Sequence, residues 1–498
     1  MDILSILIVV PLLTVIALAS GRNKQQVRIA AAIGTGIQLI LTFVLLFEYL
    51  GERSSGNIDE MVFMKSYVWF QTLNIFYTVG VDGISVSLIV LTGIILFTGV
   101  LASWKVEKMQ KEFFASLIIL ATGVFGFFIS LDLFTMFMFF EVAVIPMYLL
   151  IGIWGSGNKE YSAMKLTLML MGASAVLLVG LLGVYTNSAS FEGGPLTFNI
   201  LEIAGLNLSY DTQMTFFPMV FIGFGVLGAL FPFHTWSPDG HASAPTAVSM
   251  LHAGVLMKMG GYGCLRVAMY LMPEAASELA WIFILLTSIS IVYGAFGAIV
   301  QKDLKYINAY SSVSHCGLVL FAILMMNTTA MNGAVLQMIS HGLMTALFFA
   351  LIGMIYERTH TRDIRLMRGI MKVMPFLAVC YMIAGFASLG LPGLSGFVAE
   401  MTIFVGAFMN TDTFHRVVTI MAAASIVITA VYILRVVGAI LLGPVMDEEY
   451  KSFPDARWFE KVVTVTLILA IAAIGLAPLW LSDMITASIG VISGNFFH

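Results

Sequence analysis

The stretch FPFHTWSPDGHASAP at residues 231–245 interrupts a long apolar segment with three prolines, Pro232, Pro238 and Pro245. A second stretch, GLPGLSGF at residues 390–397, places one proline among three glycines inside another apolar segment. Proline and glycine leave backbone groups without helical hydrogen bonds, and inside a bilayer such groups are tolerated only where protein or a watery cavity satisfies them. The two interruptions therefore predict a pair of broken membrane helices.

The composition is that of a membrane protein. Of the 498 residues, 60% are hydrophobic and 10% are charged, whereas a soluble protein carries about 25% charged residues. The net charge of −4 offers no basic face for nucleic acid. The three cysteines form no CxxC pair, so neither a zinc site nor an iron–sulfur cluster is indicated. These features argue against a water-soluble enzyme and against a nucleic-acid binder.

A helix that crosses a bilayer needs about 20 mostly apolar residues, and by this criterion the sequence predicts about 14 transmembrane helices. Their approximate limits are 3–20, 28–49, 83–103, 113–131, 133–154, 162–186, 214–233, 244–270, 279–300, 306–326, 330–356, 373–409, 415–443 and 462–481. The first has no basic residue before it and no small-residue cleavage site after it, so we expect a retained helix rather than a signal peptide.

The interruptions fall in the seventh and twelfth predicted helices. Paired broken helices at corresponding positions are typical of the internal repeats of secondary transporters. The predicted fold is therefore an all-α polytopic membrane protein with two inverted five-helix repeats, each with a broken helix. Ordinary kinks in membrane helices are the alternative interpretation. The predicted parts are three N-terminal helices at 1–112, a first repeat at 113–270 with its break near 232–245, a second repeat at 279–443 with its break near 391–396, and a C-terminal helix and tail at 444–498.

Basic residues predict the orientation, because they are more frequent in cytoplasmic loops. Loops after the odd-numbered helices hold 17 lysines and arginines. The opposite side holds four, namely Arg53, Lys65, Arg266 and Arg416. Both termini of this multi-pass protein are therefore predicted outside the cytoplasm. No presequence of mitochondrial type is visible, so we expect the bacterial inner membrane, with a protein encoded in an organelle as the alternative.

Two charged residues lie near the middle of predicted helices, where a charge costs about 2.5–3.5 kcal/mol on insertion scales. Glu141 is in the fifth helix and Lys258 in the eighth. Burial favours the neutral form of each group, so both suit a proton carrier whose neighbours change charge. The alternatives are a structural acid that locks two helices at Glu141, and a lysine at Lys258 whose charged end reaches the membrane surface.

Two histidines and a second acid extend this set. Histidine both accepts and gives up a proton near neutral pH, which suits a relay, although a lone membrane histidine often only joins two helices. These groups together predict a polar line across the bundle at mid-depth, formed by Glu141, Lys258, His315, His341 and Glu400.

Other polar residues are assigned smaller roles. Lys165, near the end of the sixth helix, and His252, six residues before Lys258, are possible accessory groups. Asp82 opens the third helix, where an acid stabilises a helix N-terminus. Arg362 and Asp363 are interpreted as a solvated or subunit-facing patch. Neither a P-loop nor a dinucleotide-binding glycine motif is found.

Four long segments resemble a known family. They are FPFHTWSPDGHASAPTAVSMLHAGVLMKMGGYGCLR, QKDLKYINAYSSVSHCGLV, LQMISHGLMTALFFALIGMIYERTHTRDI and GLPGLSGFVAEM. They are similar to the antiporter-like subunits of respiratory complex I, the proton-pumping NADH:quinone oxidoreductase, and the YERTHTRDI block is most similar to the subunit lettered M, or chain 4. Related chains occur in multisubunit sodium/proton antiporters and in membrane-bound hydrogenases.

The resemblance implies roles for individual residues. Glu141 matches the family glutamate that modulates a lysine on broken helix seven, Lys258 matches the helix-eight lysine, and Glu400 matches the terminal acid of helix twelve. His315 and His341 fall in the segments that supply the connecting polar groups. The helix-seven lysine itself is absent, because its position is occupied by Leu227. Glu141 is therefore expected to pair elsewhere, with Lys165 or through water with His234.

The resemblance also implies the function. We expect a proton-translocating membrane subunit, coupled to NADH oxidation and quinone reduction on other subunits. FMN, iron–sulfur clusters, NADH and quinone are expected on those partners, and no cofactor on this chain. The expected neighbours are other complex I membrane subunits, including homologous antiporter-like subunits on either side, and the lipid bilayer. The alternatives are a subunit of a sodium/proton antiporter or of a related membrane-bound hydrogenase, and a structural spacer.

Overall fold

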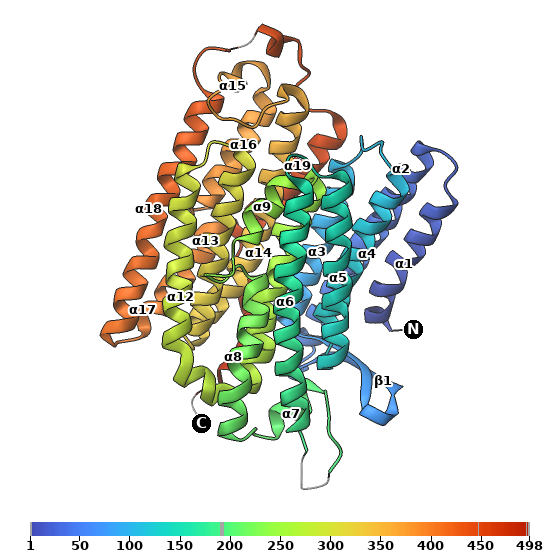
Figure 1. Ribbon diagram of the computed structural model, residues 1–498, viewed down its shortest axis with the longest axis vertical. Coiled ribbons are helices and arrows are strands. Elements are labelled where there is room, and N and C mark those ends of the chain that lie inside the picture. Colours follow the sequence, from blue (N-terminus) through green and yellow to red (C-terminus); the bar gives the residue numbers. More distant parts are fainter. Residues whose placement is uncertain (1, 190–193, 447, 495, 497–498) are drawn as a thin grey trace.

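Long helices that run side by side along the longest axis form most of the chain (Figure 1). The computed structural model describes residues 2–189, 194–446, 448–494 and 496. Both termini lie in the lower part of the bundle in Figure 1, together with a β-hairpin and the short helix α7 (Ile200–Gly205). The short helix α15 (Ile370–Val373) lies at the upper end.

Within the described ranges, eleven helices are long and apolar enough to cross a membrane. They are α1 (Ile3–Ser20), α2 (Lys24–Ser54), α3 (Gly83–Ala102), α4 (Gln110–Ile129), α5 (Leu133–Trp154), α6 (Lys159–Thr186), α12 (Pro273–Val300), α13 (Leu304–Leu324), α14 (Thr328–Thr359), α18 (Thr413–Leu441) and α19 (Trp458–Leu476). Most of α13 and α14 is buried by other helices, which places these two at the centre of the bundle.

Three of the predicted membrane helices consist of shorter segments. The seventh is broken into α8 (Tyr210–Leu227) and α9 (Trp236–Ser243), and the twelfth into α16 (Pro375–Ser388) and α17 (Ser395–Met409). Both interruptions recognised in the sequence therefore break a helix. The eighth is continuous but irregular, because α10 (Thr246–Leu251) and α11 (Met257–Gly263) are followed by π-helical turns at His252–Leu256 and Cys264–Met269.

A third break was not predicted. The helix α19 ends at Leu476, and α20 (Leu479–Gly494) begins after Pro478. Proline has no backbone N–H and fits the start of a helix better than its interior, so the chain bends at this point. The tail predicted to follow the last membrane helix is therefore largely helical, and its residues 495, 497 and 498 lie outside the described residues.

A β-hairpin also lies outside the all-α prediction. Strands β1 (Val62–Phe70) and β2 (Ile75–Val81) pair antiparallel across the short turn Gln71–Leu73. Several large apolar side chains of β1 are exposed, among them Val68 and Trp69. The segment is rich in β-branched and aromatic residues, which favour strands, but it is too short to register as a membrane helix.

Each half of the chain contains an aspartate that caps a membrane helix and also forms an isolated β-bridge. Asp132 accepts hydrogen bonds from the first turn of α5 and forms a β-bridge with Asn199. Asp303 accepts hydrogen bonds from the first turn of α13 and forms a β-bridge with Asp363. The side chain of an aspartate at this position satisfies N–H groups that have no partner within the helix.

The glycine contacts repeat in the same way. A Cβ atom added to Gly123 of α4 would lie 2.5 Å from the backbone nitrogen of Ala143 in α5. A Cβ atom added to Gly294 of α12 would lie 2.6 Å from the backbone nitrogen of Ser314 in α13. Each glycine thus allows two helix backbones to approach closely.

Two buried ion pairs tie distant segments together. Arg266 pairs with Asp82, the residue that caps α3, and both side chains are sealed from solvent. Arg266 had been counted with the basic residues of the outward side, near the end of the predicted helix 244–270; the structure instead buries it inside the bundle. The predicted cap at Asp82 is present. Near the upper end of the bundle, Arg358 of α14 pairs with Glu460 of α19 at 2.7 Å.

Candidate functional site

A hydrogen bond between Lys258 and His341 lies at the centre of the bundle. Lys258 is on α11 and His341 on α14, and each side chain is 1% exposed. The Lys258 ammonium donates to Nδ1 of His341 at 2.7 Å and to the carbonyl oxygen of Ala253. Ala253 belongs to a π-helical turn, a feature that frequently marks functional sites.

His315 lies next to His341, so that the buried polar side chains form a row that starts at Lys258. The two imidazole rings have centroids 5.2 Å apart. Gln337 Nε2 donates to Nδ1 of His315 at 3.0 Å, and the Ser388 hydroxyl lies 3.5 Å from Nε2. Both ring nitrogens of His315 therefore have a polar neighbour that fixes the orientation of the ring.

Glu400, on α17, is the last side chain of the row and follows the break between α16 and α17. Its Oε1 lies 3.8 Å from Nδ1 of His315, and the side chain is buried. The other oxygen, Oε2, faces Gly390, where an added Cβ atom would lie 2.7 Å from it. Gly390 has φ +64°, a conformation that glycine adopts readily. The break between α16 and α17 thus makes room for this carboxyl group.

The structure joins four of the five predicted relay residues, in the spatial order Lys258, His341, His315 and Glu400. Glu141 is not part of this row. It lies on α5 with its side chain partly exposed, and its buried Oε1 has no hydrogen-bond partner in the described part of the chain. Sequence position gave the depth of Glu141 correctly as mid-helix, but not the direction in which its side chain points.

Lys165 pairs with Asp239 and not with Glu141. Its ammonium donates to Oδ2 of Asp239 at 2.7 Å. The alternative suggested from the sequence, a Glu141–Lys165 pair, is therefore wrong, because this part of α6 packs against α9. His234, the other suggested partner, is buried beside Tyr293, with ring centroids 4.8 Å apart.

His252 lies in a group of rings that includes a histidine the sequence analysis missed. Its ring stacks on Trp236 at 5.1 Å and lies 4.2 Å from the ring of His241. Neither His241 nor His252 has a hydrogen-bond partner on its ring nitrogens within the described ranges. Such buried polar atoms are places where water or a mobile proton would be held. His241 is in the quoted stretch 231–245, and its place beside the break was the available signal.

Leu227 is fully buried at the end of α8. Next to it, a cavity of about 10 Å³ lies between Gly228, Lys258, Cys316 and Leu320. A cavity of this size holds about one water molecule. The space that the absent helix-seven lysine would need is therefore apolar and nearly closed.

A cleft of about 410 Å³ opens at the upper end of the bundle and is lined by Ala244, the residue that follows α9; we call it the α9 cleft. Lys305 and Arg362 line it. Lys305 donates to the carbonyl oxygen of Ala244 at 2.6 Å, and Arg362 donates to that of Ala242 at 2.8 Å. Cations at the C-terminal end of a helix are stabilised by its exposed carbonyl groups.

Two predictions are corrected here. Arg362, interpreted as part of a solvated patch, instead pairs with Asp303 at 3.0 Å and holds α9, whereas Asp363 pairs with the exposed Arg365. The Arg365 side chain keeps the pKa of Asp363 low, at about 2. Lys305, counted among the loop residues, is buried.

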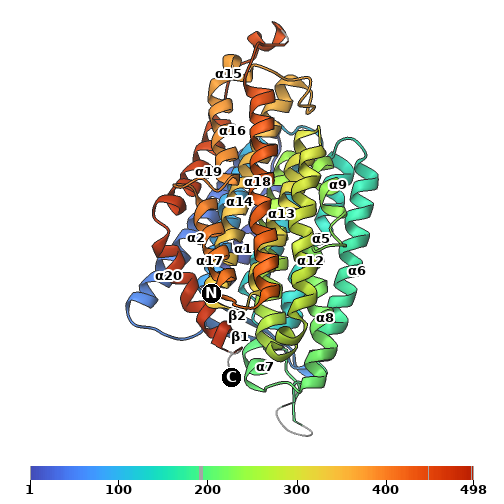
Figure 2. The ribbon, with the colours of Figure 1, turned by 90° about the vertical axis from the view of Figure 1, so that its left-hand side faces the viewer.

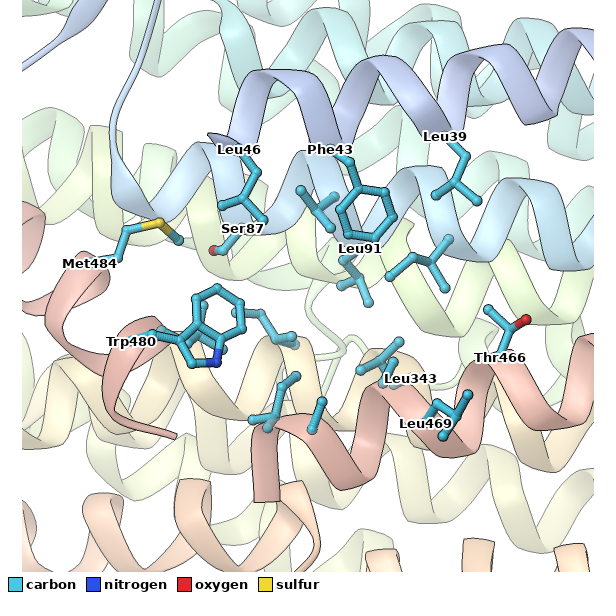
Figure 3. A pocket seen from close by; sticks show the side chains of 17 residues that line it. Leu39, Phe43, Leu46, Ser87, Leu91, Leu343, Thr466, Leu469, Trp480 and Met484 are labelled. Carbon is cyan, nitrogen blue, oxygen red and sulfur yellow. The ribbon is translucent and has the colours of Figure 1, made fainter. Parts of the chain in front are cut away.

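A separate groove of about 370 Å³ is lined almost wholly by apolar side chains of α2, α3, α14, α19 and α20 (Figure 3). Ser87 and Thr466 supply its hydroxyl groups. It contains no titratable side chain, so it does not extend the row from Lys258 to Glu400. Among the residues with described positions, no three His, Cys, Asp or Glu side chains gather as a metal site would require.

Residues 130–436 match the family model described as NADH:quinone oxidoreductase/Mrp antiporter, transmembrane. This chain belongs to that family. The family region contains Glu141, Lys258, His315, His341 and Glu400. The family resemblance seen in the sequence motifs is therefore confirmed.

Relatives from other bacteria cover nearly the whole chain. NADH-quinone oxidoreductase subunit M of Rickettsia prowazekii is 35% identical over 481 residues, which is 96% of each chain. NAD(P)H-quinone oxidoreductase chain 4 of Microcystis aeruginosa is 35% identical to this chain. The matched region covers 95% of this chain and 90% of the Microcystis protein.

Solved structures share the fold. A chain of respiratory complex I from Thermus thermophilus has a TM-score of 0.90 at 23% identity, covering 99% of this chain and 100% of its own length. A chain of the Mrp complex from Dietzia sp. has a TM-score of 0.83 at 19% identity, covering 99% of this chain and 98% of its own length. The predicted fold class, a helical polytopic membrane protein of the antiporter-like type, is confirmed.

Proposed function

We propose that this chain translocates protons across the bacterial inner membrane as the subunit M, or chain 4, of NADH:quinone oxidoreductase. NADH oxidation and quinone reduction would take place on partner subunits, which hold the FMN and iron–sulfur clusters. The row of buried contacts from Lys258 to Glu400 supports this proposal most strongly. The family membership and the names of the Rickettsia and Microcystis relatives support the assignment to this complex.

The proton moves along the row in single transfers. Lys258 gives a proton to Nδ1 of His341 across their hydrogen bond, and His341 then gives up the proton on its other ring nitrogen. Ring rotation or one water molecule bridges the 5.2 Å between the centroids of His341 and His315. His315 passes a proton to Glu400, 3.8 Å away. Glu400 releases it toward the outer side.

Movement of one charge against 100 mV costs about 2.3 kcal/mol, so an external reaction must drive it. Within the described part of the chain, Glu141 forms no hydrogen bond or ion pair with the row. In this proposal it acts on Lys258 through the electric field of its charge.

The arrangement of the chain in the membrane is part of the proposal. Residues 113–270 and 279–443 form two inverted five-helix repeats, after three N-terminal helices at 1–112 and before the C-terminal part at 444–498. The matching caps at Asp132 and Asp303 and the matching glycine contacts support the repeat. Both termini lie on the outer side, so the α9 cleft opens to the cytoplasm.

NADH-driven proton uptake in inverted membrane vesicles tests the function. We expect Lys258→Met to abolish uptake at equal complex content, while Lys461→Met, a surface variant, pumps like the wild type. Normal uptake in Lys258→Met vesicles would contradict the relay. Proton uptake that follows an imposed sodium gradient without NADH would instead indicate the sodium/proton antiporter class.

A further inference from the structure

Asp239 is held by two helices other than its own. It lies in the first turn of α9. Lys165 of α6 donates to its Oδ2 at 2.7 Å, and the Tyr306 hydroxyl of α13 donates to its Oδ1 at 3.0 Å. Each carboxylate oxygen therefore has one strong donor, and α9 is joined to both halves of the chain through this one side chain.

The Lys165–Asp239 pair is more open than the other deep ion pairs. Both of its side chains are 23% exposed, whereas Arg266 and Asp82 are each 1% exposed. Separation of a fully buried pair leaves two uncompensated charges and is strongly unfavourable. A pair with partial access to its surroundings opens at lower cost, so the Lys165–Asp239 contact is suited to a reversible change.

The short helix α9 also connects Asp239 to the surface and to the buried histidines. Ala244, the residue that follows α9, lines the α9 cleft. The middle of the same helix carries His241, whose ring nitrogens have no partner in the described ranges and which faces His252 at 4.2 Å. Asp239 therefore lies on the same short helix as His241, and the chain reaches the cleft directly after this helix, at Ala244.

We propose that Asp239, controlled by Lys165, is the group that takes up protons from the cytoplasmic side in this chain. When the pair is closed, the Asp239 carboxylate accepts hydrogen bonds from both Lys165 and Tyr306. When Lys165 moves away, the carboxylate keeps only its bond from Tyr306, and Oδ2 is free to bind one proton from water on the cytoplasmic side.

Return of Lys165 to Oδ2 displaces the proton, which passes to the imidazole of His241 or His252. The proton leaves the Asp239 carboxyl and binds a ring nitrogen, so no other reactant is needed. This inference rests on the proposed function, because it supplies the row from Lys258 to Glu400 with its protons. It also gives the first half of the chain a charge switch despite Leu227.

Asp239→Asn in the complete complex is the central test. The amide oxygen of asparagine still accepts hydrogen bonds from Lys165 or Tyr306, so the fold is preserved while the titratable group is lost. We expect proton uptake per complex in inverted vesicles to fall by about 100-fold or more, the contribution typical of a positioned acid–base group. Asp239→Glu keeps a carboxylate and should retain most of the uptake. Wild-type uptake in Asp239→Asn vesicles would overturn the proposal.

The exchanged pair Lys165→Asp with Asp239→Lys separates proton uptake from a purely structural role. It rebuilds an ion pair between α6 and α9 but leaves no carboxylate on α9. We expect normal complex content without pumping. Restored pumping would mean that the pair only fastens two helices, which would overturn the proposal. Glu107→Gln, which breaks the exposed Lys24–Glu107 pair, is the matched control and should pump normally.

Lys258→Met in the same membranes distinguishes this inference from the proposed function. Loss of pumping in Lys258→Met but not in Asp239→Asn would leave the relay standing and reject Asp239 as the uptake group. Normal pumping in both variants would reject the relay and the inference together. If Asp239→Asn lowers complex content, uptake per complex in Asp239→Glu and in the exchanged pair decides the question: loss in the glutamate variant would count against the proposal.

Discussion

Lys258 Nζ lies 2.7 Å from Nδ1 of His341, and this hydrogen bond joins two residues that are 83 positions apart in the chain. It is a buried contact between the first half of the bundle and the second. On one side of it are His252 and His241, and on the other His315 and Glu400. A proton that crosses the chain along this row must pass through this bond.

Replacement of His341 therefore interrupts the row at its centre. We expect His341→Ala to lower NADH-driven proton uptake by about 100-fold or more, the contribution typical of a positioned acid–base group. The complex content should change little, since alanine suits a helix interior. Uptake by inverted vesicles, normalised to complex content, measures the effect. Uptake within a factor of about two of the wild type would show that protons bypass His341.

Gly390 allows Glu400 to reach His315. We expect Gly390→Ala to reduce pumping, because the added Cβ would lie 2.7 Å from Glu400 Oε2 and the residue has φ +64°. The carboxyl must move away from the imidazole. Gly438→Ala on α18 is the control, since nothing lies within 4 Å of its added Cβ. Equal pumping by the two variants would show that the position of Glu400 is not critical.

Arg266 stabilises the fold through Asp82. Arg266→Met leaves the Asp82 carboxylate buried and unpaired, which we expect to destabilise the protein by about 3–5 kcal/mol. The thermal midpoint of the purified complex in detergent and the complex content of membranes both report this loss. The double variant Arg266→Met with Asp82→Asn removes both charges and keeps a side chain that caps α3, so it should recover much of the stability. A double variant no more stable than the single one would mean that Arg266 acts by packing.

Glu141 acts in our proposal without touching the row. We expect Glu141→Gln to lower proton uptake, but less than Lys258→Met does, because only the field of the charge is lost. Both variants are compared in the same vesicles at equal complex content. A loss as large as that of Lys258→Met would place Glu141 in the path itself, and no loss would make it a structural acid.

The sequence alone determined the depth of each group in the bundle. Helix rise is constant, so the position of Lys258 or His341 within an apolar segment gives its distance from the ends. The free-energy cost of placing a charge or an unpaired backbone group in a bilayer depends on the segment that carries it. The two breaks and the residues beside them can therefore be recognised without knowing how the helices pack. The membrane class, the broken helices and the four proposed relay residues that lie in one row followed from these local rules.

Tertiary structure decided which groups meet. The direction of a side chain around its helix depends on how that helix packs, and the π-helical turn at His252–Leu256 shifts that direction for Lys258. Because α6 packs against α9, Lys165 contacts Asp239 rather than Glu141. In the same way, the packing of the helices buries Arg266 against Asp82. Depth is a property of one segment, whereas a contact is a property of two, and only the folded chain brings the second segment into place.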